Sequence, residues 1–134
     1  MWKQAVFPLT DEAKKRVHFL GHLSTQELSR VTGSAFSLSY VPYFEGFGIP
    51  LVEAMRCGIP IISADASCLP EIAGDAAIYC DPFSIEEITA QMIRLTGDKK
   101  LHQTLSENAL KRSSNYSWDE AAEQIWQLIS KHQT

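Results

Sequence analysis

The sequence predicts an α/β layered domain in which a parallel sheet is flanked by helices. Short apolar runs alternate along the chain with segments whose apolar residues recur at helical spacing. Ser-x-x-Glu capping boxes, which begin at Ser24, Ser84 and Ser117, mark where helices start. Strands that are joined by helices pair in parallel, because each crossover returns the chain to the same end of the sheet.

The first elements follow in order from residue 17. Val17 to Leu20 is predicted as a short apolar strand that ends in a glycine. Ser24 then begins a helix whose apolar face carries Leu28 and Val31. Ala35 to Val41 is the next expected strand, and it leads into a glycine-containing loop.

The helix that follows this loop begins near Pro50, which suits a first turn because its missing N–H would have had no partner there. From Leu51 to Cys57 the residues leave no polar face apart from Glu53 and Arg56. A helix that is apolar nearly all round is a buried helix. We therefore expect Glu53 to be paired, hydrogen-bonded or protonated, because a bare buried carboxylate is costly.

The second half continues the alternation. Gly58 is predicted to cap that helix, Ile59 to Ser63 to form a central strand, and Ala76 to Cys80 to form another. Three helices with buried stripes follow: one from Ser84 with Ile85, Ile88, Met92 and Leu95 inside, one after Asp98 with Leu101, Leu105 and Ala109, and one from Ser117 with Ala121, Ile125, Leu128 and Ile129.

Composition limits the class of protein. One domain, residues 1–134, is expected, and its hydrophobic content of 45% is ordinary for a globular chain. The net charge of −4 argues against a nucleic-acid partner, and no apolar run or leader pattern predicts a membrane span or secretion. The chain has three widely spaced cysteines, Cys57, Cys68 and Cys80, and no Cys-x-x-Cys motif, so we expect reduced thiols and a cytoplasmic location. The cysteines form no ligand cluster with the histidines, so we expect no metal site.

The loop Glu45-Gly46-Phe47-Gly48 and the helix after it combine features of a ligand site. Free N–H groups, a positive dipole end and glycines that allow close approach make an anion site. Glu53, one to two turns in, would accept hydrogen bonds from hydroxyls of the same ligand, which points to a nucleotide or sugar nucleotide. The plainer alternative is that Glu53 is hydrogen-bonded to a neighbouring backbone and has no ligand.

The run from Glu45 to Pro82 resembles the C-terminal domain of retaining glycosyltransferases with two facing Rossmann-like domains, the glycosyltransferase family 4 group. A Glu, seven residues and a second Glu, here Glu45 and Glu53, have the spacing of that family. The other matching pieces, spread over residues 17 to 130, are Val17-His18-Phe19-Leu20-Gly21, Cys57-Gly58-Ile59-Pro60-Ile61-Ile62, Leu69-Pro70-Glu71-Ile72, Gly74-Asp75-Ala76-Ala77, Asp81-Pro82 and Tyr116-Ser117-Trp118.

The resemblance implies a partial Rossmann-like sheet and a role for each site residue. Glu45 would be the catalytic-site carboxylate that contacts donor-sugar hydroxyls, and Glu53 would take both ribose hydroxyls. Gly21 and His22 would lie near the base. The positions that contact the donor sugar and diphosphate, mainly through backbone N–H groups, would be Gly46, Phe47, Gly48 and Ile49.

The same resemblance implies the chemistry. A sugar would pass from a nucleoside-diphosphate sugar to an acceptor hydroxyl with retention, by front-face attack and without a covalent intermediate, in polysaccharide or glycolipid assembly. The nucleotide sugar is a substrate and no cofactor or metal is implied; uridine diphosphate sugars are favoured over guanosine diphosphate sugars. Val41 and Pro42 replace the Pro-Ser that the family usually carries before the first Glu, which leaves sugar identity open.

Several pieces of the family's enzyme are expected to be missing. Only Met1 to Arg16 precede the Val17 strand, whereas the family has two further strand–helix units with an Arg and a Lys for the diphosphate. We therefore expect a fragment, inactive alone, whose partners are the N-terminal acceptor domain and a second copy of the chain, joined through the exposed sheet edge or a helix surface. The full-length enzyme would lie at the inner membrane face.

Two alternatives stay open from the sequence. The chain could be a nucleotide-binding module without turnover, or a flavodoxin-like α/β module that binds partners through its helices. We expect Trp118 and Trp126 to pack in the core or against another domain rather than to stack on a substrate. For Glu71 we expect a structural role rather than a position near the donor.

Overall fold

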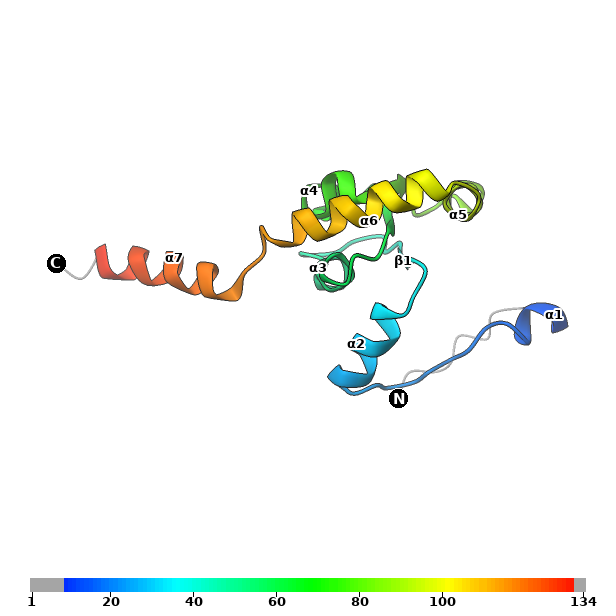
Figure 1. Cartoon of the computed structure of the whole chain (residues 1–134), viewed down its shortest axis with the longest axis horizontal. Coiled ribbons are helices and arrows are strands. Elements are labelled where there is room, and N and C mark those ends of the chain that lie inside the picture. Colours follow the sequence, from blue (N-terminus) through cyan, green and yellow to red (C-terminus); the bar gives the residue numbers. More distant parts are fainter. Residues whose placement is uncertain (1–8, 132–134) are drawn as a thin grey trace.

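The computed structural model describes residues 9–131 and confirms an α/β domain with a three-stranded parallel sheet (Figure 1). Residues 1–8 of the Met1 to Arg16 segment lie outside the described residues. The elements, in chain order, are α1 (Asp11–Lys14), α2 (Thr25–Gly33), β1 (Leu38–Tyr40), α3 (Ile49–Arg56), β2 (Ile61–Ala64), α4 (Leu69–Ala73), a 3-10 turn η1 (Gly74–Ala76), β3 (Ala77–Cys80), α5 (Ile85–Gly97), α6 (Lys99–Ser113) and α7 (Trp118–Lys131).

The sheet has the order β1-β2-β3, with β2 in the centre. Leu38 pairs with Ile61, and Ile61 pairs with Ala77, so all three strands run in the same direction and end at the same edge. Every residue of β2 is buried, which agrees with the continuous apolar run expected of a central parallel strand.

Two apolar clusters hold the helices to the sheet. In the first, Leu51 and Met55 of α3 pack with Leu69 of α4 and with β2. In the second, Ile62 of β2 packs with Leu95 of α5, together with Ile78, Cys80 and Leu105. The first cluster supports the site described below, because it fixes α3 against β2 and α4.

Local capping signals were predicted correctly. Ser24 and Glu27 form both halves of the capping box at the start of α2. Gly58 takes a left-handed conformation with φ +68°, and the Ile59 N–H donates to the Ala54 carbonyl at 2.9 Å, which is the bond pattern of a Schellman motif. Ser84 accepts from the Glu87 N–H at the start of α5.

The predicted strand from Val17 to Leu20 is wrong. These residues form no strand, and Phe19 and Leu20 are exposed. A strand needs a neighbour for its N–H and C=O groups, and β1 pairs only with β2 within the described residues. The chain between α1 and α2 instead runs apart from the sheet (Figure 1).

Helix faces expected to be buried are exposed in three places. On α7 the predicted inside residues Ile125 and Ile129 are exposed, because this helix extends away from the sheet (Figure 1). Ile85 and Met92 of α5 are exposed as well, and so are the apolar residues Leu28 and Val31 of α2. No helix among residues 9–131 combines the length and apolarity that crossing a bilayer requires.

Candidate functional site

The loop between β1 and α3 lies at the carboxyl end of the sheet, where ligands of open α/β sheets bind. Gly48 ends this loop as the N-cap of α3 and has φ +91°, a left-handed conformation. A Cβ at this position would come within 2.8 Å of the Leu69 Cδ2 atom. The glycine is therefore required by both the backbone conformation and the close approach of α4.

The N-terminus of α3 leaves donors available. Gly48 provides no side-chain cap, and Pro50 lies in the first turn. The Leu51 N–H donates to the Gly48 carbonyl at 2.9 Å, whereas the N–H of Ile49, as the first helical residue, has no acceptor within the helix. With the helix dipole, this arrangement favours an anion.

Glu45 is half-buried and held by several hydrogen bonds. The Tyr40 hydroxyl donates to Oε2 of its carboxylate, and the Gly46 N–H donates to Oε1 at 2.9 Å. The Tyr40 hydrogen bond is the main reason that the pKa of Glu45 lies below its ordinary value, with a smaller contribution from the Gly46 N–H. The same hydrogen bond raises the pKa of Tyr40 to about 12.

Glu53 differs from its expected environment. It lies on the exposed stripe of α3 with Ile49 and Arg56, so the prediction that it is buried is wrong. The helix buries only the side that carries Leu51, Ala54 and Met55. No hydrogen bond or ion pair joins the Glu53 side chain to other described residues, and its carboxylate oxygens are open to a ligand.

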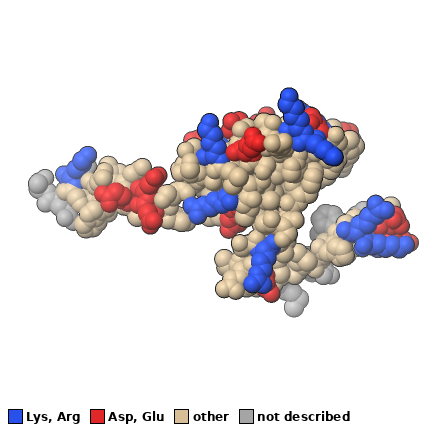
Figure 2. All heavy atoms as spheres, in the orientation of Figure 1, with Lys and Arg blue, Asp and Glu red and all other residues tan. Residues whose placement is uncertain are grey.

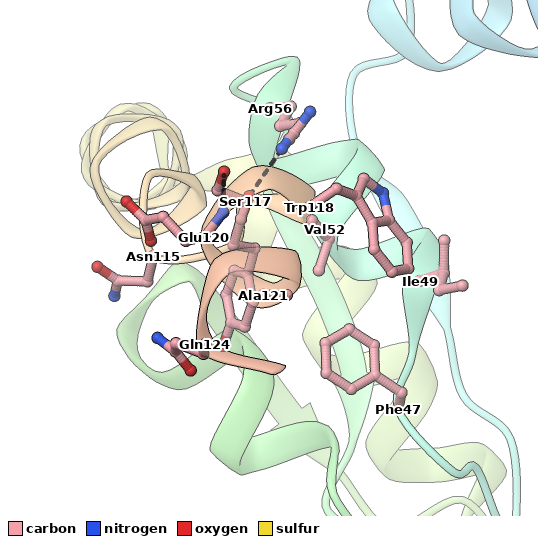
Figure 3. Close-up of a pocket in the computed structure, with 11 residues that line it drawn as sticks. Phe47, Ile49, Val52, Arg56, Asn115, Ser117, Trp118, Glu120, Ala121 and Gln124 are labelled. Atoms are coloured by element: carbon pink, nitrogen blue, oxygen red, sulfur yellow. Dashed lines mark hydrogen bonds between the residues drawn. The ribbon is translucent and has the colours of Figure 1, made fainter. Parts of the chain in front are cut away.

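A cavity of about 300 Å³ lies between the side of α3 that carries Ile49, Val52 and Arg56 and the start of α7 (Figure 3). The Arg56 guanidinium donates to the Tyr116 carbonyl at 2.7 Å and so joins α3 to the segment that leads into α7. Phe47 and Tyr116 meet edge to face with ring centroids 6.0 Å apart. The lining residues are Phe47, Ile49, Val52, Arg56, Asn115, Tyr116, Ser117, Trp118, Glu120, Ala121 and Gln124.

Charges are mixed on the visible face of the molecule (Figure 2). Acidic side chains gather near the start of α7, where Asp119 and Glu120 lie in its first turn, and Lys131 lies in its last. These positions complement the helix dipole. Within residues 9–131 no group of three or more His, Cys, Asp or Glu side chains could hold a metal ion.

The structure brings together most of the predicted site residues, but not all of them. Residues 45 to 48 lie in one loop, Ile49 begins α3, and Glu53 lies one turn into that helix. Gly21 and His22 lie in the exposed segment before α2, which Figure 1 shows apart from α3. Their assignment near the base stays a prediction, as do the ligand roles of the loop residues.

Three residues beside Glu45 were missed by the sequence analysis. Tyr40 bonds the carboxylate, the Ser67 hydroxyl accepts from the Glu45 N–H at 3.2 Å, and the Cys68 thiol donates to the Glu45 carbonyl at 3.2 Å. Tyr40 ends β1 and Ser67 follows the neighbouring parallel strand β2, so the shared sheet edge was the available signal.

Comparison with known proteins gives consistent matches. The family model described as glycosyl transferases group 1 matches residues 9–112. O-antigen chain mannosyltransferase B of Escherichia coli is 29% identical over 108 residues, which cover 81% of this chain and 28% of that protein. Serotype-specific mannosyltransferase WbdA, also of Escherichia coli, is 27% identical over 110 residues, which cover 82% of this chain and 14% of that protein.

A solved structure matches as well. Sucrose-phosphate synthase from Thermosynechococcus elongatus superimposes with a TM-score of 0.80 at 25% identity, over 90% of this chain and 31% of that one. The chain thus spans less than a third of the length of each of these relatives.

Proposed function

Because this chain belongs to the group 1 glycosyltransferases, we propose that it is the donor-binding part of a retaining enzyme that uses a nucleoside-diphosphate sugar. The acceptor would be a hydroxyl of a growing polysaccharide or glycolipid. Two relatives are named mannosyltransferases, which supports a hexose and favours mannose as the transferred sugar. The rest of the enzyme would supply the acceptor site.

One observation carries this proposal: two carboxylates flank the free N-terminus of α3. Glu45 lies before the helix, and the open carboxylate of Glu53 lies one turn beyond Ile49. A diphosphate would accept hydrogen bonds from N–H groups at the helix start, while Glu45 would accept from sugar hydroxyls and Glu53 from ribose hydroxyls.

The chemistry follows from where charge develops. In a retaining transfer the departing nucleoside diphosphate gains negative charge, and fixed N–H donors at the start of α3 would stabilise it. The only basic residue of α3, Arg56, is at the opposite end of the helix. The cations that neutralise the diphosphate would therefore come from the remainder of the enzyme.

Substitution of Glu53 tests the proposal. In the complete enzyme, Glu53→Gln should weaken donor binding at least about tenfold, because charge-assisted hydrogen bonds contribute roughly 1.5–3 kcal/mol each. Isothermal titration with GDP-mannose and UDP-glucose measures the affinity and also identifies the nucleotide. Glu123→Gln on α7 removes the same charge elsewhere on the surface and should leave affinity unchanged; equal affinities for all three proteins would exclude Glu53 from the site.

Turnover is tested separately. The chain alone should show neither transfer nor donor hydrolysis, and joining it to the N-terminal half of a group 1 enzyme should restore activity that depends on Glu45. A joined protein that binds donor but never turns over would favour the alternative of a binding module.

A further inference from the structure

Glu45 is tied to the protein from the ends of two neighbouring strands. Tyr40 is the last residue of β1, and its hydroxyl donates to the carboxylate of Glu45. Ser67 and Cys68 follow β2, and they bond the backbone N–H and carbonyl of Glu45 at 3.2 Å each. Carboxylate and backbone are therefore fixed independently.

These ties reduce the freedom of a side chain that would otherwise be mobile. A glutamate in a surface loop samples several rotamers, and ordering it on ligand binding costs free energy. Tyr40 takes one acceptor position on Oε2 and the Gly46 N–H takes one on Oε1. Since an ionised carboxylate offers about four acceptor positions, both oxygens keep capacity for hydroxyls of a ligand.

Ser67, which accepts from the Glu45 N–H, has an unusual backbone conformation. Ser67 has φ +49°, and among the described residues it is the only one other than glycine with a positive φ. Such conformations persist where the surroundings determine them and they occur at functional sites. Here the strained residue places its hydroxyl against the N–H of Glu45.

We infer that Tyr40 is a positioning residue that holds the Glu45 carboxylate, ionised and in one rotamer, for the hydroxyls of the donor sugar. Ser67 and Cys68 fix the backbone from which that carboxylate extends. This inference rests on the proposed function. It adds a group outside the motif that runs from Glu45 to Glu53, since Tyr40 comes from the strand before the loop.

Tyr40→Phe tests the inference, because it removes the hydroxyl and keeps the ring. Carbon-13 NMR of the 134-residue chain, with the Glu45 signal assigned by Glu45→Gln, should show the pKa of Glu45 rising when the Tyr40 hydrogen bond is lost. The affinity for GDP-mannose or UDP-glucose, followed by ligand-observed NMR up to millimolar concentration, should fall about fivefold to tenfold. This is less than the loss of a charge-assisted hydrogen bond to the ligand itself, because the Gly46 N–H still holds Oε1 of Glu45.

Tyr79→Phe is the matched control. The Tyr79 hydroxyl donates to the Gly74 carbonyl at 2.7 Å. Tyr79 lies in the same sheet as Tyr40, and its pKa is likewise raised to about 12. Its hydroxyl does not contact Glu45, so Tyr79→Phe should change neither the pKa of Glu45 nor the donor affinity. A general loss of packing would affect both variants and would show in their thermal unfolding.

The outcomes separate this inference from the proposed function. If Glu45→Gln weakens donor binding and Tyr40→Phe does not, the positioning role is overturned and the proposed function stands. An unchanged pKa of Glu45 in Tyr40→Phe also overturns it. If the wild-type chain binds neither nucleotide sugar, the proposed function fails for this chain and the positioning role fails with it.

Discussion

At the scale of single residues, Gly48 shows how local geometry decides what the site can be. It combines a left-handed backbone with contact against Leu69, a fully buried residue of α4. A larger residue would have to move that core side chain and adopt an unfavourable conformation at the same time. The close packing also holds the start of α3 against α4.

We expect Gly48→Ala to lower the free energy of unfolding by roughly 2–4 kcal/mol, because alanine disfavours this φ and its Cβ would crowd Leu69. Urea unfolding measures this. Gly46→Ala is the control in the same loop, because a Cβ there meets nothing within 4 Å. Equal stability of Gly48→Ala and the wild type would mean that the loop relaxes away from α4.

The cysteines should differ in reactivity. Cys80 is buried, and that burial is the main reason that the pKa of its thiol is raised, so little thiolate forms and reagents have no access. Cys57 is exposed. Alkylation with N-ethylmaleimide followed by mass spectrometry should label Cys57 first and Cys80 only on unfolding; rapid labelling of Cys80 in the folded chain would contradict this burial.

At the scale of elements, α6 stabilises α4 through one side chain. The Arg112 guanidinium donates from Nε to the Ile72 carbonyl at 2.7 Å and from Nη2 to the Glu71 carbonyl at 2.6 Å. These carbonyls belong to the last turn of a short helix, where carbonyl groups have no N–H donor within the helix. Arg112 thereby fixes α4, whose Leu69 supports Gly48.

Arg112→Lys should lower the free energy of unfolding by about 1–2 kcal/mol, because an ammonium group cannot reproduce both bonds of the planar fork. Lys111→Arg, at the exposed neighbouring position, should change it by less than about 0.5 kcal/mol. Chemical denaturation of both variants measures the difference, and equal effects would exclude a specific role for the guanidinium.

At the scale of the whole molecule, the predictable part of the fold is the part set by local chemistry. Ser24 and Gly58 are caps because hydrogen bonding and glycine geometry act within a few residues. The predictions of a strand at Val17 and of a buried face at Ile125 were wrong. Each required a packing or pairing neighbour that is absent among the described residues. The loop from Glu45 could be located from its motif, whereas the Tyr40 contact required side-chain geometry.

The uncovered apolar surface leads to a prediction for the assembled molecule. Trp126 is 62% exposed and Ile125 59% exposed on α7, and β1 has one edge without a strand among the described residues. Exposed apolar faces and free strand edges favour association with another chain. We expect the chain to form a homodimer at micromolar concentration, measured by light scattering coupled to size-exclusion chromatography.

Substitutions can identify which surface forms the dimer. Ile125→Glu with Ile129→Glu should shift the mass to that of the monomer if α7 provides the contact, because each charge would be buried without a partner. Ser39→Pro removes an N–H from β1. This variant should also shift the mass to that of the monomer if the sheet edge provides the dimer contact, and it should lower the stability of the chain somewhat. Glu123→Lys, on the same helix as Ile125, is the control for a charge change alone. A monomeric mass for the wild type would contradict both modes and would mean that the apolar face of α7 stays uncovered in the isolated chain.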